Sequence, residues 1–302
     1  MFGVDAGRSK ANTGSLKMGS VSGSVPMTRR NLDERVAVVT GAASVIGRAI
    51  AQNLADKGCH LALVDVDESG LEETRSIVAR DDRRCTTHIA DVSDKARMQA
   101  LPDEVAAAHG QVHILVNNAG VSVGSFFADH SIEDAEWVIG VNLWGVLYGC
   151  KFFLPHLKQA DWAQIVNISS LFGFFGMPGQ ACYSMTKAAV KALSEALWTE
   201  LANTNVSVTS VHPGVIRTKL ISSSRIEDPE ERQKAIEMAD KHGLDPDKVG
   251  RLVARAIERN QPRLIVGGDA RASQWLSRAF PNGLHSMLTL AFKKANVTGM
   301  QN

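Results

Sequence analysis

A tyrosine and a lysine stand at a spacing that could support proton transfer. Tyr183 and Lys187 are four residues apart in a helical pattern, so both side chains project from one face. The pKa of a phenol is about 10, and a neighbouring ammonium lowers it by favouring the phenolate. Tyr183 could then take a proton from an alcohol or give one to a carbonyl. The same spacing also occurs on ordinary helix surfaces, so the pair needs support from the rest of the chain.

A serine precedes this helix at the end of an apolar strand. Ser170 follows the stretch Gln164–Ser169 and could hydrogen-bond the reacting oxygen of a substrate. Together the three side chains would suit the interconversion of an alcohol and a carbonyl compound.

A glycine-bearing turn near the first strand predicts a dinucleotide site. The strand runs into Thr40–Gly47, and a helix follows, whose N-terminal N–H groups and dipole suit a pyrophosphate. The second strand ends at Asp65, where a carboxylate can meet the two adenosine ribose hydroxyls and repel a 2′-phosphate. Because Ser44 places no cation in the loop, NAD is favoured over NADP. Alternatively, Asp65 is a solvated carboxylate at a strand end.

The elements that must position these residues alternate along the chain. Short strands that are apolar throughout, each followed by a helix, predict a doubly wound parallel α/β sheet of about seven strands, covered on both faces. The expected strands are Arg35–Thr40, Cys59–Asp65, Cys85–Ala90, Val112–Asn117, Gln164–Ser169, Val206–His212 and Arg263–Val266. The expected helices span 46–57, 68–79, 94–108, 133–158, 183–203 and 246–259.

The chain is expected to hold one Rossmann-type domain over residues 34–302. Residues 1–33 are rich in Ser, Gly and basic residues and predict a flexible tail. Residues 215–242 are polar and helix-prone and are expected to form a lid over the substrate. Residues 270–302 form an extension whose apolar side chains should bury against the site or another subunit.

Composition excludes several classes of protein. The formal net charge is +1, which gives no reason to expect nucleic acid or anionic lipid as a partner. No apolar run reaches the roughly 18 to 20 residues of a membrane span, and the N-terminus lacks the apolar core of a secretory signal. The four scattered cysteines predict a cytoplasmic protein with reduced thiols and no zinc site: Cys59, Cys85, Cys150 and Cys182.

With these residues assembled, residues 35–268 strongly resemble the short-chain dehydrogenase/reductase family, in its common single-domain branch. Thr40–Gly47 matches its glycine turn, Asn117–Gly120 its Asn-Asn-Ala-Gly sequence, and His212–Thr218 its Pro-Gly turn. Asn142, Ser170, Tyr183 and Lys187 match its catalytic residues in order. Cofactor-binding positions indicated by the residues or the resemblance are Gly41, Ser44, Val45, Ile46, Gly47, Asp65, Asp91, Val92, Asn118, Ala119, Gly120, Tyr183, Lys187, Pro213, Gly214, Val215, Ile216 and Thr218.

The resemblance implies a role for each catalytic residue. Tyr183 would be the acid/base, its pKa lowered by Lys187 and by oxidised nicotinamide, and Lys187 would also hold the nicotinamide ribose. Ser170 would orient the substrate oxygen, and Asn142 would hold a water that connects Lys187 to solvent. Hydride would pass directly between nicotinamide and substrate carbon, without a metal. The helices near 133–158 and 183–203 would pair between subunits in a homotetramer or homodimer.

One position departs from the family pattern. Val45 stands where the glycine turn usually has a second glycine, and a β-branched side chain tolerates positive φ badly. If position 45 has helical dihedrals, Val45 only crowds the cofactor. If it needs positive φ, the turn must be rebuilt, and a catalytically silent NAD-binding or scaffold protein becomes the alternative. We expect the helical case.

The substrate is predicted from apolar residues near Ser170. Leu171–Met177 follows the serine, and Phe126 and Phe127 follow the nicotinamide-side strand. Such walls favour an apolar alcohol or ketone resembling a lipid, steroid or terpenoid, unless several of these side chains are ordinary core or subunit contacts. A 3-oxoacyl thioester is the other candidate, although no basic cluster suggests an acyl carrier. The preference for NAD only weakly favours oxidation as the direction of the reaction.

Overall fold

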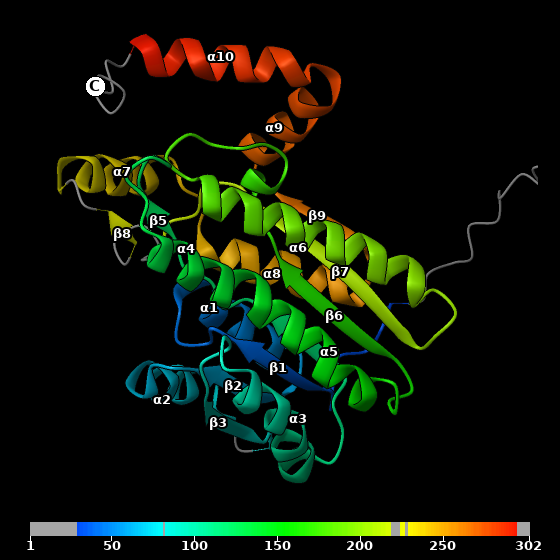
Figure 1. Cartoon of the computed structure of the whole chain (residues 1–302). Coiled ribbons are helices and arrows are strands. Elements are labelled where there is room, and N and C mark those ends of the chain that lie inside the picture. The colour runs from blue at the N-terminus through cyan, green and yellow to red at the C-terminus, as the bar shows by residue number, and fades with distance from the viewer. Residues whose placement is uncertain (1–28, 81, 219–223, 227–228, 295–302) are drawn as a thin grey trace, which may run out of the picture.

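Seven parallel strands form the central sheet, in the order β3-β2-β1-β4-β6-β7-β9 (Figure 1). The computed structural model describes residues 29–80, 82–218, 224–226 and 229–294. The strands are β1 (Val36–Thr40), β2 (His60–Asp65), β3 (Cys85–Ile89), β4 (Ile114–Asn117), β6 (Ala163–Ile168), β7 (Val206–Pro213) and β9 (Arg263–Val266). The chain leaves β1 in one direction for β2 and later returns to β4 on its other side. Ligands of doubly wound sheets bind at this switch point, beyond the carboxyl ends of the strands.

Helices cover both faces of the sheet, as the sequence predicts. On one face α1 (Val45–Ala55) packs against α8 (Pro246–Glu258), with α2 (Glu68–Val78) beside α1. On the other face α5 (Gly145–Leu157) contacts α3 (Lys95–His109), and α6 (Ala181–Glu200) lies beside it (Figure 1). The expected doubly wound, single-domain α/β fold is therefore confirmed.

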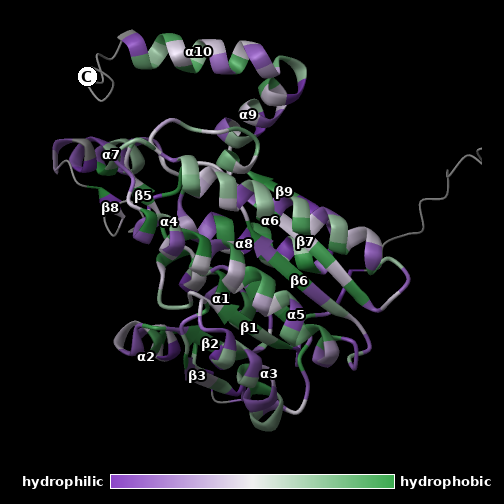
Figure 2. Cartoon of the chain, in the orientation of Figure 1, coloured by the Kyte–Doolittle hydropathy of each residue, from purple (hydrophilic) through white to green (hydrophobic). Residues whose placement is uncertain are grey.

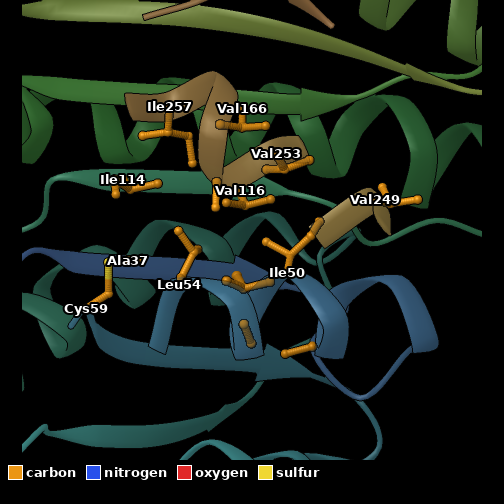
Figure 3. Close-up of a cluster of buried hydrophobic side chains, with 14 of the residues drawn as sticks. Ala37, Ile50, Leu54, Cys59, Ile114, Val116, Val166, Val249, Val253 and Ile257 are labelled. Atoms are coloured by element: carbon orange, nitrogen blue, oxygen red, sulfur yellow. The ribbon is translucent and has the colours of Figure 1, made fainter. Parts of the chain in front are cut away.

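Alternate residues of the inner strands face the two helical layers. Ala37 and Val39 of β1 belong to the core cluster under α1 and α8, whereas Val36 and Val38 belong to the cluster under α3 and α5. Each inner strand is thus buried on both sides, which explains its continuous apolar sequence. Figure 3 shows the first cluster, in which side chains of α1 and α8 meet those of the strands: Ala37, Ile50, Leu54, Cys59, Ile114, Val116, Val166, Val249, Val253 and Ile257. In Figure 2 the inner strands are mostly hydrophobic, whereas the helices mix hydrophobic and hydrophilic residues.

A small second sheet lies beside the carboxyl ends of the main strands. β5 (Val123–Gly124) pairs in parallel with β8 (Arg225–Ile226), which precedes α7 (Pro229–His242). The Arg225 guanidinium lies 2.5 Å from the Asp134 carboxylate on α4 (Ile132–Ile139) and over the Trp137 ring, 3.9 Å from its centroid. Arg225 therefore attaches the described part of the expected lid to α4. Closure of that lid over a substrate stays a prediction.

Two further helices end the described chain. α9 (Gly268–Ala279) packs against β9 and the short 3₁₀ helix η2 (Leu171–Gly173), and α10 (Pro281–Lys294) packs on α9. In Figure 1, α10 stands apart from the sheet, joined to it through α9. Trp275, Phe280 and Met287 are more than half exposed in the single chain, so they are not buried against the site, and burial against another subunit stays a prediction.

The last residues of the predicted flexible tail belong to the domain. Residues 1–28 of that tail lie outside the described residues. Arg30 donates its backbone N–H to the Glu258 carbonyl and its guanidinium to Ser207, 3.0 Å away, and Leu32 is buried in the core. Residues 30–33 are therefore held by the domain, because one apolar side chain and one arginine suffice to anchor so short a stretch.

Among the described residues, one helical stretch, Ile132–Leu157, is long and apolar enough to span a membrane. It comprises α4, the π turn η1 (Gly140–Trp144) and α5, and it packs against α3, α6 and β4. Since it carries Asn142 into the interior, we interpret it as a core helix of this fold.

Candidate active site

The glycine turn takes the form that a diphosphate site requires. Gly41 has a φ of +66°, and a Cβ there would lie 2.8 Å from the Ala119 Cα. A Cβ at Gly47 would lie 2.0 Å from the Gly41 carbonyl oxygen, so both positions need glycine. Ser44 caps α1 by accepting the Gly47 N–H.

Val45 is the first residue of α1. It follows the Ser44 cap, and it is not among the described residues with positive φ, which apart from glycine are Glu34 and Asn260. The helical case expected for Val45 is therefore the one observed, and the turn needs no rebuilding around its side chain. The scaffold alternative loses the feature on which it depended.

Asp65 is joined to the glycine turn. One carboxylate oxygen accepts the Ala43 N–H at 2.9 Å, and the other accepts the N–H groups of Val66 and Asp67. The half-buried carboxylate thus lies between the turn and the end of β2. This is where a ribose hydroxyl pair would meet it.

The first and fourth strands are linked at their carboxyl ends by side chains. Thr40 Oγ1 accepts the N–H groups of Asn118 and Ala119, at 3.0 and 3.1 Å. The Asn118 amide in turn donates to the carbonyls of Thr40 and Gly41. Asn118 therefore holds the glycine turn rather than presenting its side chain to a ligand. Asp91 likewise binds the N–H and hydroxyl of Ser93, and Val92 is buried.

Lys187 is buried at the centre of the site. Its Nζ donates to the Ile168 carbonyl at 3.1 Å and lies 5.5 Å from the centroid of the Tyr183 ring. Gly120 opens the space in front of it, since a Cβ there would lie 3.4 Å from Nζ. Burial lowers the pKa of Lys187 to about 8. The lysine is thus close to titration near neutral pH, and a hydroxyl or phenolate that replaces its lost hydration would be bound strongly.

Tyr183 lies between Ser170 and the aromatic segment after it. Burial raises the pKa of Tyr183, and a hydrogen bond with Ser170 acts in the opposite direction. The pKa of Tyr183 is therefore raised, whereas the sequence suggests a lowered one. The reason is that desolvation of the phenolate outweighs the stabilisation from Ser170. The Phe172 ring meets the Tyr183 ring edge to face, with centroids 6.2 Å apart.

Asn142 lies in the π turn and is fully buried. Its Oδ1 accepts the Val121 N–H and its Nδ2 donates to the Val121 carbonyl, both at 2.8 Å. A second contact joins Nδ2 to Thr186 Oγ1 at 3.4 Å, on the turn of α6 that carries Lys187. π turns interrupt helices often at functional positions. Here the turn lets Asn142 fasten the strand-end loop after Gly120 to α6.

The Pro213–Thr218 turn follows β7 and has a partner that the sequence did not indicate. Asp269, at the start of α9, accepts the Val215 N–H at 2.7 Å. A Cβ at Gly214 would lie 2.1 Å from the same carboxylate, which explains the glycine. Ile216 is buried and forms a bridge with Leu244. No motif marked Asp269; its position in the first turn of a helix after the last strand was the only available signal.

The aromatic residues after Ser170 divide into two groups. Phe172 contacts both Phe175 and Tyr183 and forms an apolar wall at the site. Phe174 instead stacks on His212, with ring centroids 4.5 Å apart, and His212 binds Ser210. Burial lowers the pKa of His212 to about 4, so this imidazole is a neutral structural group. Part of the segment is therefore core.

The chain belongs to the short-chain dehydrogenase family, whose model matches residues 35–229. It is 35% identical over 268 residues to the putative oxidoreductase SadH of Mycobacterium tuberculosis, with 87% of this chain and 97% of that protein covered. A short-chain dehydrogenase/reductase from Burkholderia phymatum in complex with NAD superposes with a TM-score of 0.77 and 32% identity, over 82% of this chain and 94% of that one. A 3-ketoacyl-(acyl-carrier-protein) reductase from Brucella melitensis complexed with NADH superposes with a TM-score of 0.70 and 27% identity, over 79% of this chain and 99% of that one.

The protein is thus an oxidoreductase of that family, and its site residues fit a nicotinamide dinucleotide. The first turn of α1 offers N–H groups without intrahelical partners and carries no acidic side chain, which suits a diphosphate. Gly120 leaves room beside Lys187, where a ribose could reach the ammonium. Within the described residues, no group of three or more His, Cys, Asp or Glu could hold a metal ion.

Proposed function

We propose that this protein is an NAD-dependent enzyme that interconverts a secondary alcohol and a ketone on an apolar small molecule. The observation that carries the proposal is the arrangement of Ser170, Tyr183 and Lys187. The Ser170 side chain opposes the rise that burial causes in the pKa of the phenol, and the buried ammonium lies 5.5 Å from the ring centroid. No other tyrosine in the chain competes for the role, because Tyr148 stacks on Trp144 and Phe152 on the outer side of α5.

Each residue then has a chemical task. The bound nicotinamide would accept or donate the hydride. Tyr183 Oη would take the alcohol proton during oxidation and return it during reduction. Ser170 Oγ would hold the substrate oxygen beside that phenol, and Lys187 would stabilise the phenolate and bind the ribose. Asn142 would keep the Val121 loop and α6 in place for a water that relays the proton outward.

Asp65 supports NAD over NADP. A carboxylate at the end of β2, held by the turn N–H groups, favours ribose hydroxyls and repels a 2′-phosphate. The apolar substrate is supported by the wall that Phe172 and Phe175 make beside Tyr183. The 3-oxoacyl thioester alternative is supported by the likeness to the Brucella reductase.

Further properties are proposed on the same basis. Trp144, the last residue of η1 before α5, and Trp198 on α6 are each about half exposed, which suits pairing of α5 and α6 in a homodimer or homotetramer. The cysteines of the described chain are all free, which suits a cytoplasmic location.

Binding and turnover together test the function. Purified protein is titrated with NADH and with NADPH, and NAD reduction is then followed with apolar secondary alcohols; 3-oxoacyl thioesters are tested with NADH. We expect NADH to bind tightly and NADPH weakly. Tyr183→Phe should lower kcat by roughly 10²- to 10⁴-fold and retain NADH binding. Tyr148→Phe, the only other tyrosine, is the matched control. Equal turnover by the two variants would overturn the acid/base assignment.

A further inference from the structure

The C-terminal helices expose an apolar surface that the active site does not explain. Four large side chains of α9, α10 and the residue between them are each more than half exposed: Trp275 (62%), Phe280 (57%), Met287 (61%) and Leu290 (58%). The Trp275 and Phe280 rings meet edge to face, with centroids 5.8 Å apart, so the two aromatic residues form one surface. We call these four residues the C-terminal apolar face.

α10 is amphipathic, with an apolar side and a polar side. At 100° per residue, Leu284, Met287, Leu288, Leu290, Ala291 and Phe292 fall within one side of the helix, an arc of about 200° that also contains Gly283 and Lys294. Asn282, His285, Ser286, Thr289 and Lys293 occupy the other. Leu284 is buried toward α9, which leaves Met287 and Leu290 as the outward part of the apolar side. A water-facing helix would not need this arrangement.

The charge of this segment differs from that of the chain. From Ala270 to the end of the sequence there is no Asp or Glu, whereas Arg271, Arg278, Lys293 and Lys294 are all basic. The chain as a whole has 33 basic and 32 acidic residues, so its balance hides this local excess. The acid just before this stretch, Asp269, is bound to the Val215 N–H. Exposed apolar side chains with flanking cations and no acids are complementary to an anionic lipid surface.

We propose that α9 and α10 dock the protein on the surface of an anionic phospholipid membrane. The C-terminal apolar face would enter the boundary between headgroups and acyl chains, with Trp275 in the interfacial position that indole rings favour. Arg271, Arg278 and Lys293, all exposed, would meet lipid phosphates. This proposal differs from the expectation of no lipid partner, which depended on the charge of the whole chain.

The position of the docking helices relates them to the catalytic residues. α9 contacts η2, which begins directly after Ser170, and Asp269 of the same helix holds the nicotinamide-side turn. A membrane bound at α10 would therefore lie on the side of the molecule that carries η2 and the turn after β7. The docking itself does not depend on the proposed reaction.

Co-sedimentation of the full chain with vesicles tests the proposal without any substrate. We expect the protein to pellet with phosphatidylcholine vesicles that contain phosphatidylglycerol, less with phosphatidylcholine alone, and less at high salt. The double variant Met287→Asp/Leu290→Asp should bind roughly tenfold more weakly or worse, because both side chains are exposed and would carry charge into lipid. Arg278→Gln should weaken binding by roughly fivefold.

A matched control and a mass measurement complete the design. Ile77→Asp changes an exposed apolar residue of α2, at the opposite end of the molecule in Figure 1, and should leave vesicle binding unchanged. Wild-type protein that stays in solution with both kinds of vesicle would overturn the proposal. So would a fall in oligomer mass of the double variant in analytical ultracentrifugation, because the face would then be covered by a second copy.

Discussion

The carboxylate of Asp269 accepts the backbone N–H of Val215 at 2.7 Å, although 54 residues separate them. This hydrogen bond ties the turn after β7 to the first turn of α9. The resemblance to the family implies that this turn binds the nicotinamide end of the cofactor, so we expect Asp269 to position it. We expect Asp269→Ala to raise KM for NAD by roughly fivefold with a smaller change in kcat, since one hydrogen bond to an exposed carboxylate contributes about 1 kcal/mol. Asp269→Asn, which keeps an acceptor oxygen, should restore most of the affinity.

Gly214 provides a second test of the same contact. A Cβ at this position would lie 2.1 Å from the Asp269 carboxylate, so Gly214→Ala must displace either the turn or the helix. We expect the alanine alone to raise KM for NAD more than Asp269→Ala does. In the double variant the obstructing carboxylate is absent, so the two effects should not add. If the free-energy changes calculated from KM for the two single variants add up to that of the double variant, a direct contact between the two residues would be contradicted.

Ser170 is expected to set the pH at which Tyr183 works. Burial raises the pKa of Tyr183 and the hydrogen bond with Ser170 opposes that shift. Ser170→Ala removes the opposing contribution, so the rising limb of kcat/KM for alcohol oxidation should move to higher pH. Profiles of the two proteins, measured with the same alcohol, give the shift directly. Ser184 follows the tyrosine directly, and its hydroxyl accepts the Met177 N–H. Ser184→Ala should leave the pH profile unchanged.

Lys187 is expected to reduce the stability of the fold. Burial lowers its pKa from 10.5 to about 8, so the folded state binds fewer protons than the unfolded state between these two values. Stability therefore rises with pH through this window, and the cost is complete below about pH 8. Lys187→Met should raise the free energy of unfolding at neutral pH by about 1 to 3 kcal/mol, allowing for the lost hydrogen bond to Ile168.

Urea unfolding of both proteins at neutral and strongly alkaline pH measures this difference. The gain should shrink as the pH approaches the ordinary lysine pKa, and catalysis should be lost at every pH. A methionine variant that is less stable than wild type at neutral pH would show that the amine stabilises the core.

The sequence predicted the sheet because each inner strand is buried on both faces and therefore apolar throughout. It predicted Ser170, Tyr183 and Lys187 because their chemistry depends on residue type and spacing within one strand–helix unit. Asp269 escaped prediction since its role arises from contact with a turn 54 residues away. The exposed C-terminal apolar face escaped for a similar reason: periodicity shows that a helix has an apolar side and leaves open what covers it.

Val45 offers a test of how the glycine turn tolerates a side chain. Because position 45 begins α1 without positive φ, Val45→Gly should lower stability by about 0.5 to 1 kcal/mol through backbone entropy. The same change removes a branched side chain beside the diphosphate site, so affinity for NADH should rise by a factor of roughly two to five. Thermal unfolding and NADH titration separate the two effects. A gain in stability would show that valine strains the helix start.

Asp65 should decide between the two cofactors. Asp65→Asn keeps an oxygen for the Ala43 N–H, so the turn should remain formed while the charge that repels a 2′-phosphate is removed. We expect the preference for NADH over NADPH to fall by roughly tenfold, the effect of losing about 1.4 kcal/mol of discrimination. Titration of the variant with each reduced cofactor measures the ratio. Asp56→Asn, the exposed C-cap of α1, controls for a general change of charge. If Asp65→Asn leaves the ratio of NADH to NADPH affinity unchanged, the carboxylate serves only to hold the turn.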